Sequence, residues 1–189
     1  ALHKLCAILN STAQIQREIV KPARDSVARW YELRPFSTPP AVDIDTGSLS
    51  YLFSGNFRNV PNELMLEVDR YNTLRFTIDQ LRLYHMEQAQ PAIERMQFQG
   101  KASVESLKAA CGPRLVGILS ALTDSIVEFV DANVQSVNAA AERLRQGGQE
   151  AYGPGHFIYW IDPDKSEQPP PPLPWYRLKP SELRRPRWR

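Results

Sequence analysis

The chain has 189 residues, of which 42% are hydrophobic and 23% charged, so we expect one globular domain with appendages. A formal net charge of +2 points to no particular class of partner, and two cysteines are too few for a disulfide-rich secreted scaffold. The longest uncharged apolar run, residues 115–123, is too short to span a bilayer, and no signal peptide is visible.

The prolines separate long segments that contain few helix breakers. Eight of the 16 fall between Pro163 and Pro186, and four fall between Pro35 and Pro61. This distribution predicts long helices joined by irregular connectors.

The first predicted helix ends at Pro35, with a kink at Pro22 or a break near Val20. Its apolar side chains recur at helical spacing: Ile8, Ile15, Ile19, Ala23, Val27 and Trp30. The connector 35–60 is irregular, but it is too apolar for a flexible linker. We therefore expect it to be ordered by packing, with a short helical turn at residues 48–53.

The second predicted helix starts after Pro61, is kinked by Pro91 and ends at Gly100. Its stripe is Leu64, Val68, Tyr71, Leu74, Ile78, Leu81 and His85. The third helix follows, with Gly112–Pro113 dividing off a short lead-in and Gly147–Gly148 as its stop. Its stripe is Leu107, Leu115, Ile118, Leu122, Ile126, Phe129 or Val130, Val137, Ala141 and Leu144.

These patterns predict an all-α fold, an elongated antiparallel bundle of three long helices in up-down-up order. Residues 1–150 would form the bundle domain, and residues 151–189 an aromatic, proline-rich and basic tail. An upstream helix or a second subunit, in a homo-oligomer, would complete the packing.

The sequence offers little catalytic chemistry. His3, His85 and His156 stand in no paired-ligand motif, and the D-x-D pairs Asp43/Asp45 and Asp162/Asp164 lack the further oxygen donors of a calcium site. No nucleophile elbow or phosphate-binding loop occurs. We therefore expect a non-enzymatic protein without metal or cofactor, in which His85 belongs to the core or edge of the bundle and both cysteines are free thiols.

The C-terminal tail has the composition of an interaction segment. Residues 177–189 contain six basic side chains and one acidic one, and Pro169–Pro172 favour a polyproline II helix. The predicted partner-binding residues are Trp175, Tyr176, Arg177, Arg184, Arg185, Arg187, Trp188 and Arg189. They suit a protein partner or an anionic membrane surface, whereas nucleic acid is not expected. In the alternative, the tail packs on its own bundle through its aromatic rings.

Residues 1–85 resemble a diffuse group of uncharacterised bacterial proteins in which one N-terminal membrane helix carries a small helical domain. The resemblance rests on S-L-S-Y-L-F, on P-N-E-L and on the Tyr71/Leu74 spacing, after a first helix that ends in R-W-Y-E-L-R-P. It implies a membrane anchor upstream of Ala1, and it brings no activity or catalytic residues.

Together these observations favour a non-enzymatic interaction or scaffold domain, membrane-associated through a missing N-terminal segment and facing the cytoplasm. The alternative is a ligand-sensing bundle, with a small molecule held between the helices near His85 or under the aromatic segment 156–161. An enzyme is the third hypothesis, which a cleft with clustered carboxylates would favour.

Overall fold

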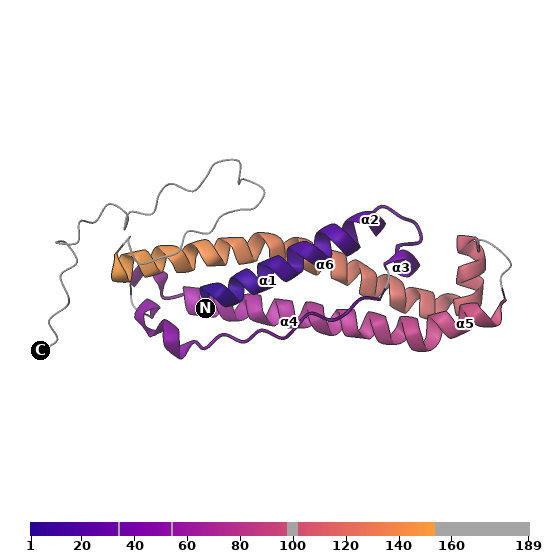
Figure 1. Ribbon diagram of the computed structural model, residues 1–189, viewed down its shortest axis with the longest axis horizontal. Coiled ribbons are helices and arrows are strands. Elements are labelled where there is room, and N and C mark those ends of the chain that lie inside the picture. Colours follow the sequence, from indigo (N-terminus) through magenta and orange to yellow (C-terminus); the bar gives the residue numbers. More distant parts are fainter. Residues whose placement is uncertain (34, 54, 98–101, 154–189) are drawn as a thin grey trace, which may run out of the picture.

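The computed structural model describes residues 1–33, 35–53, 55–97 and 102–153, and every regular element within these ranges is helical. The expected all-α class is thereby confirmed. No helix in the described ranges is both long and apolar enough to cross a membrane. The elements are α1 (Leu2–Ile15), the π-helix η1 (Gln16–Val20), α2 (Lys21–Ala23), α3 (Arg29–Glu32), the 3-10 helices η2 (Gly47–Leu52) and η3 (Gly55–Phe57), α4 (Val60–Tyr84), the π-helix η4 (His85–Ala89), α5 (Gln90–Arg95) and α6 (Val104–Tyr152) (Figure 1).

Helices α1 and α4 run in the same direction along the molecule, and α6 runs back against both (Figure 1). At one end of the bundle Leu5 packs in a cluster with Leu64 of early α4 and Leu144 of late α6. At the other end Val20 shares a second cluster with Leu81 and Leu119. The predicted up-down-up order is therefore wrong for the first two long helices, and correct only for α4 and α6.

Helices α1 and α4 can be parallel because the connector between α3 and α4 runs antiparallel to α4 and returns the chain to the end of the bundle at which α1 began. The Oη of Tyr71 donates to the carbonyl of Pro40 (3.3 Å), and the Nε of Arg75 donates to the carbonyl of Pro39 (2.6 Å). Thr38 bonds Asp79 one turn further along α4. The connector is therefore antiparallel to α4 and is ordered by packing against it, as predicted. The helical turn predicted for residues 48–53 is η2.

The apolar stripe predicted for α4 is confirmed at every position from Leu64 to His85. The stripe predicted for the first helix fails at Val27, which is 84% exposed. The reason is that the helix ends with α2, so Val27 lies in the turn before α3 instead of on a continuing helix face. Pro22 therefore has the disruptive effect that the sequence indicated.

Helix α6 confirms one glycine prediction and corrects another. Gly112 has a non-helical φ of 76°, which separates a lead-in from the main helix as expected. Gly147 and Gly148, however, do not stop the helix, which continues to Tyr152. Both glycines are buried, and a Cβ on Gly147 would lie 2.6 Å from Cδ2 of Leu52. These residues therefore allow η2 to pack on the helix backbone.

Candidate functional site

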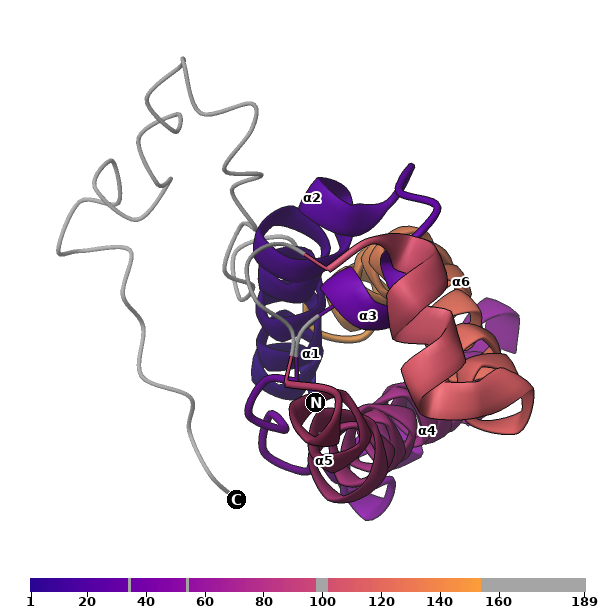
Figure 2. The same ribbon diagram turned by 90° about the vertical axis from the view of Figure 1, so that its right-hand side faces the viewer.

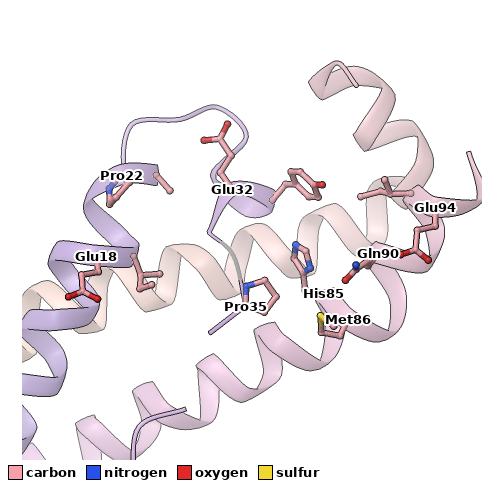
Figure 3. Close-up of a pocket in the computed structure, with 12 residues that line it drawn as sticks. Glu18, Pro22, Glu32, Pro35, His85, Met86, Gln90 and Glu94 are labelled. Carbon is pink, nitrogen blue, oxygen red and sulfur yellow. The ribbon is translucent and has the colours of Figure 1, made fainter. Parts of the chain in front are cut away.

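A large cleft lies where the first helix and α4 both bend. From that end of the molecule, α3 is seen between α2 and α5 (Figure 2). The cleft has a volume of about 930 Å³, within the range of small-molecule sites. We call it the His85 cleft; its lining residues are Glu18, Ile19, Pro22, Ala23, Tyr31, Glu32, Pro35, His85, Met86, Gln90, Ile93 and Glu94 (Figure 3).

Two prolines at equivalent positions produce the bends. Pro22 and Pro91 each follow a π-helix by two residues, and each stands four residues after a glutamate, in E-I-V-K-P-A and E-Q-A-Q-P-A. A proline inside an α-helix has no N–H to donate, and its ring meets the carbonyl four residues earlier. The wider π turn relieves this conflict. Accordingly, the N–H of Lys21 donates to the carbonyl of Gln16, and the N–H of Gln90 donates to the carbonyl of His85.

The direction of the helices places the two π turns at the same level. Because α1 and α4 are parallel, the C-terminal ends of both lie at one end of the bundle, and each carries its proline there. Residues of both π turns line the cleft, Glu18 and Ile19 from η1 and His85 and Met86 from η4. The cleft is therefore a consequence of a repeated local pattern and of the parallel topology.

His85 is the polar residue at the floor of the cleft. Its side chain projects from η4 toward the side on which Pro35 lies (Figure 3), and the residue is only 8% exposed. The ring of Tyr31 stacks on it, with centroids 5.6 Å apart and planes inclined by 21°. Within the described residues, neither ring nitrogen has a hydrogen-bond partner of regular geometry. Such a buried, unpaired polar group costs roughly 1–3 kcal/mol, so it calls for an explanation.

The environment of His85 favours the neutral imidazole. Burial lowers the pKa of His85, and the nearby backbone of Tyr31 offsets this only in part. A neutral imidazole carries one donor and one acceptor nitrogen, so it can pair with either kind of ligand group.

Three carboxylates surround the opening, each from a different segment. Glu18 comes from η1, Glu32 from α3 and Glu94 from α5 (Figure 3), and all three are exposed. Glu18 accepts a hydrogen bond from Gln14 (3.2 Å), and none of the three forms an ion pair with a residue of the described ranges. Among the described lining residues there is no lysine or arginine. The described residues of the rim therefore contribute three carboxylates and no cationic side chain.

Sequence reasoning found part of this site. It singled out His85 as a core or bundle-edge residue and as one wall of an alternative ligand site, and His85 is buried beside a cleft. It missed Glu18, Glu32 and Glu94, which are far apart in sequence. The only early signal was the E-x-x-x-P-A pattern that Glu18 shares with Glu87.

The other sequence candidates lie elsewhere. Asp45 accepts a hydrogen bond from the N–H of Gly47 (2.9 Å) and so supports the start of η2, and Cys6 and Cys111 are free thiols. Within the described ranges, no three histidine, cysteine or acidic side chains are grouped as a metal site would require. The segment 156–161, Asp162 and Asp164, and the predicted partner-binding residues from Trp175 to Arg189 lie outside the described residues.

Trp30 and Asn133 also bury polar atoms without a hydrogen-bond partner among the described residues. Asn133 lies on α6 and is 0% exposed, and both its amide oxygen and its amide nitrogen are unpaired within that part of the chain. It interrupts the apolar stripe between Val130 and Val137, which belong to the two separate core clusters. A cavity of about 500 Å³ beside it is shared with Arg70 and Ser136.

Comparisons of the chain with protein-family models, with curated proteins and with solved structures find no match.

Proposed function

We propose that this protein is a helical ligand-binding domain that holds a small molecule in the His85 cleft. The single observation that carries the proposal is His85 itself, a buried imidazole that lines a cleft large enough for a ligand and has no hydrogen-bond partner of regular geometry among the described residues. A ligand group that paired with one ring nitrogen would remove part of the cost of burying it.

Two features of the cleft favour a ligand-binding role of His85 over a purely structural one. A histidine that served only as core would be replaced at lower cost by an apolar residue of similar size. The cleft also joins segments on both sides of the first connector, because α3 and Pro35 lie between the two π turns. Binding would therefore tie α2, α3 and α5 together, which is the coupling that a sensor domain needs.

A fragment screen with a residue-specific readout tests the proposal. In protein labelled with ¹⁵N-histidine, a ligand of the cleft shifts the ring resonances of His85 and leaves those of His3 unchanged, because His3 is exposed on early α1. His85→Phe fills the space without the polar atoms, so it should keep its cooperative unfolding and lose binding. His3→Gln is the matched control. A screen in which every stabilising compound binds the His85→Phe variant equally well contradicts the proposal.

A second proposal concerns the tail and is independent of the cleft. The concentration of prolines, tryptophans and arginines after Gln168 favours contact with a protein partner, or with an anionic membrane surface. In this reading the helical domain is a scaffold, tethered by a membrane segment upstream of Ala1. Recovery of the same partners by the full chain and by a chain cut after Gln168 would show that the tail does not bind them. An upstream coding sequence without about 20 consecutive apolar residues would remove the tether.

A further inference from the structure

The charge around the His85 cleft indicates which class of ligand it takes. The three rim glutamates stand on η1, α3 and α5, so a ligand that enters between these segments meets carboxylates on three sides. Their charge is not neutralised by any ion pair within the described ranges. On α6 and α4, by contrast, some carboxylates are paired, as Asp131 is with Arg24 (2.6 Å) and Glu67 with Arg70 (2.8 Å).

The interior of the cleft suits an apolar or aromatic body. Ile19, Met86 and Ile93 contribute apolar surface, and Tyr31 and His85 contribute two stacked rings. An aromatic face attracts a cation at short range, and the attraction grows when the cation loses its water. The cleft thus combines a negative rim with an apolar, ring-bearing interior.

The imidazole of His85 can add a directional hydrogen bond to the binding of a ligand. A neutral imidazole has one unprotonated nitrogen, which accepts a hydrogen bond from a donor such as an ammonium N–H. Both nitrogens of His85 are buried in the free protein, and Tyr31 stacks on the face of the ring. A ligand would therefore reach this nitrogen only after a side-chain movement beside the ring, of the kind that occurs on the picosecond to nanosecond timescale.

We infer that the His85 cleft binds an organic cation, an amine with an aromatic or bulky apolar body. Its ammonium group donates one hydrogen bond to His85, and Glu18, Glu32 and Glu94 attract it electrostatically from the edges of the cleft. Its apolar body packs against Met86 and Ile93, with Tyr31 turned aside to cover it. This inference rests on the proposed ligand-binding function and narrows it to one class of compound.

Three compounds that share a phenyl ring and a short chain test the charge requirement. They are phenethylammonium, the neutral 2-phenylethanol and the anionic 3-phenylpropanoate, titrated into the full chain and followed through the His85 ring resonances. For compounds this small we expect weak binding, with a dissociation constant on the order of 1 mM. We expect the cation to bind at least about tenfold more tightly than the alcohol, and the anion to leave His85 unchanged.

Variants that neutralise the rim glutamates test whether these residues cause the preference for the cation over the alcohol. Replacing the three glutamates together, as Glu18→Gln, Glu32→Gln and Glu94→Gln, should abolish most of the advantage of the cation over the alcohol. The matched control makes the same change of net charge at three exposed glutamates outside the cleft lining, as Glu87→Gln, Glu105→Gln and Glu150→Gln, and should keep the preference.

The outcomes separate this inference from the proposed function. If the alcohol or the anion shifts His85 as strongly as the cation, or if the preference survives in the rim variant, the cation inference is wrong while the cleft remains a ligand site. If none of the three compounds shifts His85, the cation inference is also wrong. The wider fragment screen then decides the proposed function.

Discussion

His85 couples the stability of the fold to pH in a direction that its environment determines. Its pKa is lowered by burial in the folded state, whereas the unfolded chain should titrate near the ordinary histidine value of about 6.5. Below that pH, His85 binds a proton in the unfolded chain but stays neutral in the folded chain, so the free energy of unfolding falls. The loss continues until the pH reaches the lowered pKa of the folded state, at a limiting rate of about 1.4 kcal/mol per pH unit.

Denaturant unfolding from pH 7.5 down to pH 5.5 measures this effect as a difference between variants. We expect His85→Phe to flatten the fall in stability. Subtraction between variants cancels the titration of groups that both share, including the cleft carboxylates Glu18, Glu32 and Glu94. A wild-type slope that His85→Phe leaves unchanged would show that the ring is not kept neutral by the fold.

Gly147 offers a second prediction at the residue scale, because two opposing effects can be compared on one helix. Alanine is a better helix former than glycine by about 1 kcal/mol. At Gly147, however, the new Cβ would lie 2.6 Å from Leu52 and 3.0 Å from Phe57, whereas at Gly117 no heavy atom lies within 4 Å. We expect Gly117→Ala to stabilise the fold by up to about 1 kcal/mol, and Gly147→Ala to destabilise it by about 1–3 kcal/mol. Urea midpoints that move in the same direction for both variants would refute the close packing of η2 on α6.

At the scale of the elements, the connector is held to α4 by a few side chains. Arg75 donates to the carbonyl of Pro39, and Asn72 donates to that of Val42 (3.2 Å). Arg75→Ala should therefore lower the free energy of unfolding by about 1–3 kcal/mol, because a carbonyl loses its charged donor. Hydrogen exchange should also accelerate in residues 36–46. The control is Arg82→Ala on the same helix, whose ion pair with Asp79 is exposed and should contribute less than about 1 kcal/mol.

The two prolines make a prediction about the cleft. Replacing both, as Pro22→Ala and Pro91→Ala, restores the missing N–H groups and favours regular α-helix at both π turns. We expect a fold of equal or greater stability that binds its cleft ligand at least about fivefold more weakly, a loss of roughly 1 kcal/mol. The control is Pro113→Ala, since that proline stands outside the cleft lining at the bend of α6. Undiminished binding in the double variant would separate the π turns from the site.

On the scale of the whole molecule, sequence patterns predicted the helices better than their arrangement. The spacing of apolar residues from Leu64 to His85 correctly predicted the buried face of α4, because side chains in a helix recur with a period of 3.6 residues. The parallel relation of α1 and α4 could not be read, because it depends on Tyr71, Arg75 and Asp79 binding the returning connector. Gly147 was misread for a similar reason, since its packing partner Leu52 is distant in sequence.

The same limit applies to the candidate site. The prolines that bend the two helices were visible, and His85 was visible, but their meeting requires the parallel topology. The rim glutamates resemble any solvated helix residues until the three segments are brought together. A functional site made by tertiary structure in this way leaves little trace in local pattern.

The response of the His85 imidazole to phenethylammonium in ¹⁵N-histidine-labelled protein tests most directly whether the His85 cleft is a ligand site. We predict a saturable shift of the His85 ring resonances, unchanged resonances for exposed His3, and a clearly weaker response to 2-phenylethanol. A His85 signal that stays constant through that titration and through the fragment screen would show instead that the buried imidazole only fills space in the bundle.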